Sequence, residues 1–248
     1  MISEFPLFAF TLLTGLAGGL YVGAAVFPSK EEKNPRLLPI IVLVLVIIGG
    51  LAAMAHLGRI GNVFNVLRNP ASPLTLEGIT AALVAIMAIV DLATCKNGGN
   101  RIVRIIGAVL AFAAMFAVGH AYGVSYGVQA WIALPTTPAI VLGDASMGIA
   151  LWLFLTNNTE KTTLIGEAVI CALAAIVFAW QAVTFNSLGA DGMALIAVGA
   201  VLALCAAIVA ALQSSGKGTA KTMLLVLAVL AIVAVCVARY GFYMASIL

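Results

Sequence analysis

Long apolar runs constrain the fold of this chain more than any other feature of its sequence. A helix needs about 20 consecutive apolar residues to cross the hydrocarbon core of a bilayer, and eight runs of about this length follow one another along the 248 residues. The runs are continuously apolar, whereas strands of a membrane barrel alternate polar and apolar residues over about ten positions. The sequence therefore predicts an all-α integral membrane protein, a bundle of eight transmembrane helices.

Proline, glycine, asparagine and charged residues interrupt the runs and set the predicted helix ends. The predicted spans are 5–27, 37–56, 74–94, 102–122, 135–156, 162–184, 193–213 and 222–246. Eight spans use about 160 residues, so the connections are short and residues 1–248 form a single transmembrane domain. Two four-helix halves, about 1–156 and 162–248, are one arrangement compatible with this pattern.

The composition excludes the common soluble classes. Apolar residues make up 64% of the chain and charged residues only 8%, whereas about a quarter of the residues of a soluble domain are charged. The net charge of +3 is scattered, which excludes the clustered basic face of a nucleic-acid-binding protein. The four cysteines stand singly in apolar runs, without the spacing of a zinc or iron–sulfur site, so we expect packing roles and no metal.

Basic residues indicate how the bundle is oriented. Nine of the twelve lie in or beside the odd-numbered loops, namely Lys30, Lys33, Arg36, Lys96, Arg101, Arg104, Lys161, Lys217 and Lys221. Cytoplasmic loops of membrane proteins carry an excess of lysine and arginine. The sequence therefore predicts both termini on the outer face of a multi-pass protein of the cell's inner or plasma membrane.

Ionisable residues inside the spans are informative because a charge at the centre of a bilayer costs about 3 kcal/mol or more. Asp91 and Glu167 fall near predicted cytoplasmic helix ends, where snorkelling and pairing with nearby lysine or arginine side chains explain them. Asp144 lies too deep for this. We expect it to be protonated, or to face an inner polar group or water.

The segment from His56 to Glu77 holds the candidate site. A neutral imidazole can accept a proton from a hydroxyl group, a nearby carboxylate can carry that proton onward, and an arginine can stabilise the carboxylate and polarise a ring oxygen. His56, Glu77, Arg59 and Arg68 all lie in this segment, and a quinone head group presents the matching carbonyl and hydroxyl groups. The alternative is that His56 only caps its helix and both arginines lie among lipid head groups.

Several motifs resemble one family over nearly the whole chain. They are His56-Leu57-Gly58, an F-N-x-L run at Phe64–Leu67, Glu77 at the head of the next helix, Phe5-Pro6-Leu7, Trp131 with Pro135-Thr136-Thr137-Pro138, and an R-x-x-F-Y ending at Arg239–Tyr243. Together they are similar to the membrane anchor subunit of dimethyl sulfoxide reductase and its relatives. Asn62 departs from the family, because relatives often carry an arginine there. The interval from histidine to glutamate is also one residue short.

The resemblance implies a haem-free anchor with a quinol site near the outer face. His56 and Glu77 match the histidine and the acid of the family, Arg59 would substitute for the missing arginine, and Arg68 is a further candidate for binding the quinol. The anchor would oxidise menaquinol and pass electrons to an iron–sulfur subunit and on to a molybdopterin catalytic subunit of a heterotrimer in anaerobic respiration. The metal clusters and molybdopterin would lie only in the partners, so the chain alone would catalyse no reaction.

Two other functions remain open from the sequence. His56 and His120 both fall near outer helix ends and could ligate one haem b axially. Alternatively, Asp144 and Glu167 are the residues expected to act in a small-solute or proton transporter. The chain shows no inverted repeat, which disfavours the transporter.

Overall fold

Eight long apolar helices make up the computed structural model, which describes residues 4–29, 32–56, 68–95, 99–216 and 221–245. They confirm the predicted all-α bundle of eight membrane-spanning helices. The helices are α1 (Phe5–Val26), α2 (Leu37–His56), α4 (Pro73–Thr94), α5 (Arg101–Gly123), α6 (Thr136–Thr156), α7 (Lys161–Ser187), α8 (Met193–Ser214) and α9 (Lys221–Met244). No end lies more than three residues from its predicted position.

Local signals explain several of these ends. Ser72 caps α4, because its hydroxyl oxygen accepts a hydrogen bond from the backbone N–H of Thr75, and Pro73 occupies the first helical turn. Asn100 caps α5 in the same way. Side-chain caps of this kind satisfy donors that a helix leaves free at its N-terminus, so both helices begin at fixed points of the sequence.

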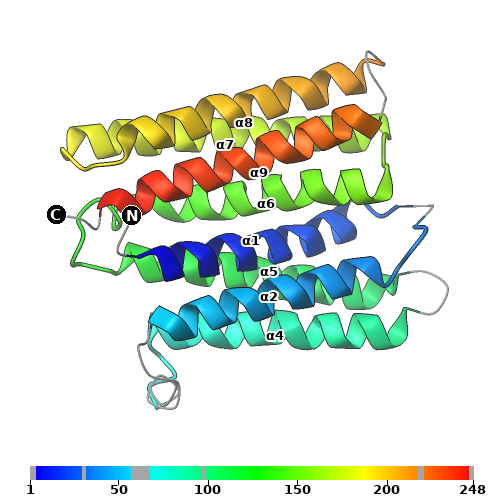
Figure 1. Ribbon diagram of the computed structural model, residues 1–248, viewed down its shortest axis with the longest axis horizontal. Helices are drawn as coiled ribbons and strands as arrows, with labels where there is room; N and C mark the ends of the chain where they lie inside the picture. The colour runs from blue at the N-terminus through cyan, green and yellow to red at the C-terminus, as the bar shows by residue number, and fades with distance from the viewer. Residues whose placement is uncertain (1–3, 30–31, 57–67, 96–98, 217–220, 246–248) are drawn as a thin grey trace.

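The helices lie side by side with their long axes nearly parallel (Figure 1). The first turn of α1 and the last turn of α9 are at the same end of the bundle, as expected for an even number of spans. Within the described residues five helices precede residue 157 and three follow it. A break at 156–162 therefore does not separate four helices from four.

Helices α1 and α6 cross at the centre of the bundle through two glycines. Gly19 and Gly148 face each other so closely that a methyl group added to either would overlap the backbone of the other helix. Small residues at helix crossings allow close backbone approach, which replaces the missing hydrophobic driving force inside a membrane. This crossing joins the two apolar cores of the bundle, because α1 and α6 contribute residues to both.

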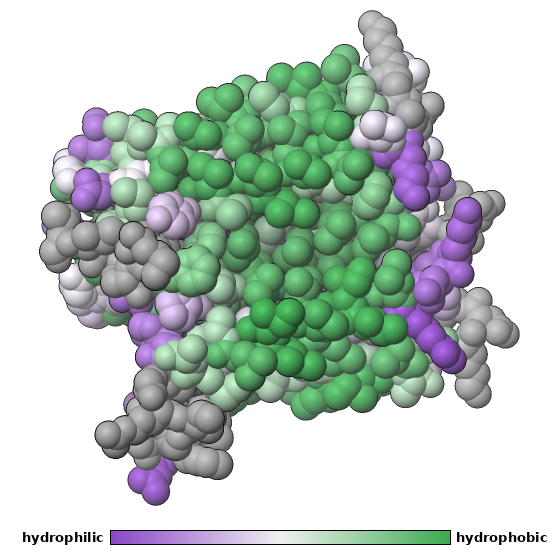
Figure 2. Space-filling view, viewed as in Figure 1, coloured by the Kyte–Doolittle hydropathy of each residue, from purple (hydrophilic) through white to green (hydrophobic). Residues whose placement is uncertain are grey.

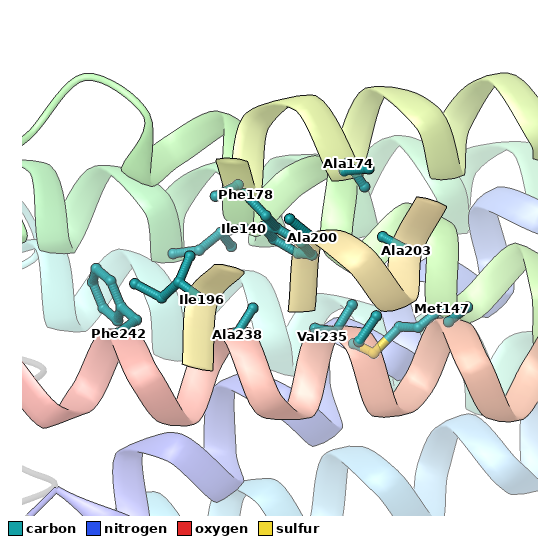
Figure 3. Packing of buried hydrophobic residues seen from close by; sticks show 14 of the residues in the cluster. Ile140, Met147, Ala174, Phe178, Ile196, Ala200, Ala203, Val235, Ala238 and Phe242 are labelled. Carbon is teal, nitrogen blue, oxygen red and sulfur yellow. The ribbon is translucent and has the colours of Figure 1, made fainter. Parts of the chain in front are cut away.

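The larger core lies mainly among α6, α7, α8 and α9 (Figure 3), and Phe8 of α1 and Tyr122 of α5 also belong to it. Alanine is the residue that α8 and α9 contribute most often to this core, and its small side chain lets the two helices approach closely. Larger side chains such as Phe178, Ile140 and Met147 fill the space beside them. The second core lies mainly among α1, α2, α4, α5 and α6.

The surface of the bundle has the distribution of apolar and polar side chains that is expected of a protein in a bilayer. A broad apolar band covers its middle, and polar side chains gather at the two ends (Figure 2). Large apolar side chains point outward along this band, including Val109 at 64% exposed and Val183 at 68%. Exposed apolar surface of this extent requires a lipid environment. The structure therefore supports a multi-pass membrane protein.

Candidate functional site

Glu77 lies buried in the second turn of α4, with 5% of its surface exposed. None of the described residues donates a hydrogen bond to its carboxylate. Its side chain lines a small internal cavity together with residues of α1, α5 and α6. A buried carboxyl group without a hydrogen-bond partner among the described residues is unusual, because buried polar groups are generally hydrogen-bonded.

His56 is the last residue of α2, at the same end of the bundle as Glu77 (Figure 1). Its Nδ1 lies 3.5 Å from Oε2 of Glu4, the residue before α1, and 38% of its side chain is exposed. No hydrogen bond joins His56 to Glu77. The structure thus brings the two predicted residues to one end of neighbouring helices without direct contact between them.

The structure does not test the roles predicted for the two arginines, Arg59 and Arg68. Arg59 lies outside the described residues. Arg68 is exposed in the connection before α4, and it forms no ion pair with any of the described residues. The prediction that these arginines hold a ligand or a carboxylate stays a prediction.

Asp144 forms a buried ion pair with Arg239, which connects α6 to α9. Nη2 of Arg239 donates to Oδ1 of Asp144 at 2.7 Å, and Nη1 donates to the backbone carbonyl of Thr11 at 2.8 Å. Asp144 and Arg239 are 1% and 6% exposed. Of the alternatives that the sequence left open for Asp144, the structure has it facing an inner polar group.

A network of hydroxyl groups continues from this ion pair toward the end of the bundle that carries His56. The Tyr243 hydroxyl lies 2.5 Å from that of Tyr122 and 3.2 Å from that of Thr11. The indole N–H of Trp131 donates to the carbonyl of Phe242 at 3.0 Å, and the two rings stack. The sequence analysis missed this network, although Arg239 and Tyr243 stand four residues apart and hence on one face of a helix.

The surface pairing predicted for Asp91 is wrong, because this residue is fully buried. Its Oδ2 accepts a hydrogen bond from Nε of Arg104 at 3.3 Å, and Arg104 also donates to both carboxylate oxygens of Glu32 at 2.7 and 2.8 Å. Arg104 is itself 5% exposed. Asp91 of α4 and Arg104 of α5 therefore both lie inside the bundle.

The surface pairing predicted for Glu167 is also wrong. Glu167 is fully buried in α7, and its Oε1 accepts a hydrogen bond from the thiol of Cys171 at 3.1 Å. Its Oε2 has no partner among the described residues. Cys171 thus packs in the core, as predicted, and also satisfies one oxygen of a buried acid.

The geometry offers little support for a haem. The side chains of His56 and His120 are both exposed, whereas the axial ligands of a haem lie inside a pocket that encloses the macrocycle. Within the described residues, no group of three or more histidine, cysteine, aspartate or glutamate side chains is placed to hold a metal ion.

Comparisons with protein-family models and with curated proteins find no match to this chain. The resemblance to the anchor subunit of dimethyl sulfoxide reductase therefore depends on the sequence motifs alone.

Proposed function

We propose that this protein is a membrane anchor subunit that binds and oxidises menaquinol near its outer face. It would pass the electrons to an iron–sulfur subunit and on to a molybdopterin catalytic subunit, in the inner or plasma membrane. The observation that carries the proposal is the position of Glu77, a buried acid without a hydrogen-bond partner among the described residues, at the end of the bundle where α2 presents His56.

The chemistry of hydroquinone oxidation explains why these residue types belong together. Oxidation releases two protons and two electrons, so the site needs proton acceptors and a path for electrons. A histidine at the head-group level can accept the hydrogen bond of a quinol hydroxyl, and a nearby carboxylate can take up a proton. His56 and Glu77 would have these two roles.

The surroundings of the two residues fit an amphipathic ligand. The exposed ring of His56 stands at the polar end of the bundle, and the apolar outer surfaces of α2 and α4 lie directly beside it. A quinone carries a polar head and an isoprenoid tail, so its head can reach His56 while its tail stays in the lipid. Arg59 and Arg68 would orient the head group, and the connections 58–73 and 123–134 would contact the iron–sulfur subunit.

Activity of the assembled complex tests the proposal. His56→Phe and Glu77→Gln should each lower quinol-linked turnover by about 10²- to 10⁴-fold, the usual cost of losing a proton-transfer group. Turnover with an artificial dye that reduces the soluble subunits directly should stay unchanged. Glu167→Gln is the matched control, because it alters a buried glutamate at the opposite end of the bundle.

Two results would contradict the proposal. One is full quinol-linked turnover in either variant with normal assembly. The other is purification of the protein from its native membrane, in mild detergent, with no iron–sulfur or molybdopterin subunit bound.

A further inference from the structure

Two acids from different helices line the same small cavity inside the bundle. Glu77 comes from α4 and Asp144 from α6, and the cavity between them has a volume of about 10 Å³. That volume is about what one ordered water needs, and a buried water also requires polar partners. Thr14 of α1 adds a hydroxyl group to the lining, and the other lining residues are apolar or glycine.

Two features of α1 and α9 hold Asp144 at this cavity. Gly15 lies against the carboxylate so closely that a methyl group at this position would overlap all its atoms. On the other side, Arg239 donates to Oδ1 and is fixed by its second bond to the carbonyl of Thr11. The carboxylate therefore has a defined position between a glycine, an arginine and the cavity.

Among the described residues that line the cavity or form ion pairs with its lining, the charges balance only when one proton is present. Glu77 and Asp144 supply two carboxyl groups, and Arg239 supplies one positive charge. The other titratable groups nearby are Tyr122 from α5, and Tyr243 and Cys236 from α9. Since an uncompensated charge is costly inside a membrane protein, the trio of Glu77, Asp144 and Arg239 is neutral with one proton and negative without it.

We propose that Glu77 and Asp144 act as one acid pair that holds a single proton. Arg239 compensates the charge of one carboxylate, and the proton, which either acid can hold, neutralises the other. The source of that proton rests on the function proposed above. Both O–H bonds of a bound hydroquinone break; one proton bonds to the carboxylate of Glu77, the other bonds to the imidazole of His56, and the two electrons leave to the iron–sulfur subunit. Water in the cavity then exchanges the proton of Glu77 with Asp144.

Infrared spectroscopy of the purified protein tests the pair without any quinol. The carboxyl bands of Asp144 and Glu77 are assigned by their loss in Asp144→Asn and Glu77→Gln, and each is followed as a function of pH. Acids that share a proton titrate as a pair. In Glu77→Gln, which leaves the ion pair with Arg239 intact, we expect the titration midpoint of Asp144 to move by about one pH unit or more. Glu167→Gln should leave it unchanged.

An unchanged midpoint of Asp144 in Glu77→Gln would overturn the proposal, because the two acids would then titrate independently. Asp144→Asn, which leaves Arg239 without its partner, serves only to assign the band, and the midpoints are compared in proteins that retain Asp144. Gly15→Ala provides a second perturbation that retains both acids but displaces the carboxylate of Asp144. It should also move the midpoint, whereas Gly50→Ala, which meets nothing within 4 Å, should not.

Turnover of the assembled complex separates this proposal from the proposed function. Asp144→Asn should slow quinol-linked turnover by about tenfold or more and leave dye-linked turnover unchanged. If Glu77→Gln retains full quinol-linked turnover while the midpoint of Asp144 moves, the proposed function is wrong and the acid pair stands. If Glu77→Gln abolishes quinol-linked turnover while the midpoint does not move, the acid pair is wrong and the proposed function stands.

Discussion

At the scale of single residues, the strongest prediction about stability concerns the buried ion pair between Asp144 and Arg239. Arg239→Gln removes the charge that compensates Asp144, and breaking a buried pair from one side costs about 3–5 kcal/mol. We expect a lower unfolding temperature of the purified protein in detergent. Adding Asp144→Asn to Arg239→Gln should recover part of the loss, since no uncompensated charge then remains.

Arg68→Gln is the control for this measurement, because Arg68 is exposed and substitutions of exposed residues usually change stability by about 0.5 kcal/mol or less. Equal unfolding temperatures for Arg239→Gln and the unchanged protein would contradict a structural role of the pair.

The surroundings of the buried acids can be predicted only in part from the sequence, for physical reasons. Depth along a helix can be counted from the sequence, which is why Asp144 was expected to need an inner partner. Whether a residue near a helix end points inward depends on how helices pack, and this information is missing from the sequence of one helix. Asp91 and Glu167 therefore proved buried where surface pairing was expected. The network of Tyr122, Tyr243 and Thr11 joins residues more than 100 positions apart, so no local pattern indicates it.

At the scale of helices, the crossing of α1 and α6 should be the contact least tolerant of larger side chains. Gly148→Leu would place a branched side chain against the backbone of α1, which has no room even for a methyl group. Overpacking of a dense core typically costs about 1–3 kcal/mol, and occasionally more. We expect reduced yield of folded protein and a lower unfolding temperature, measured beside Gly50→Leu on α2, where nothing lies within 4 Å.

Tolerance of Gly148→Leu equal to that of Gly50→Leu would show that α1 and α6 do not approach through these glycines. Helix existence and helix ends were predictable here because apolar length and capping residues such as Ser72 and Asn100 act locally. Which helices occupy the centre was not predictable. The central position of α1 and α6 follows from glycine contacts between segments more than 100 residues apart.

At the scale of the whole molecule, the distribution of basic residues predicts which end faces the cytoplasm. Lys33, Arg36, Arg101, Lys161 and Lys221 lie at the end opposite His56 and Glu77, so the positive-inside rule predicts that His56 faces outward. A cysteine introduced at Asn69 should react with an impermeant thiol reagent in intact cells. A cysteine at Asn157, at the other end, should react only after the membrane is permeabilised.

The reverse labelling pattern would invert the orientation and move the proposed docking face of the iron–sulfur subunit to the cytoplasm. The bundle itself would be unaffected, because its packing does not depend on the direction of insertion.

Direct labelling by a photoreactive menaquinone analogue tests the central claim, that quinol binds where α2 ends and α4 begins. The analogue is added to the purified complex, cross-linked by light, and the labelled residues are identified by mass spectrometry. We expect labelling in the last turns of α2 and the first turns of α4, near His56 and Glu77, and competition by unlabelled menaquinone. Specific labelling confined to the opposite end of the bundle, around Glu32 and Arg104, would contradict this claim.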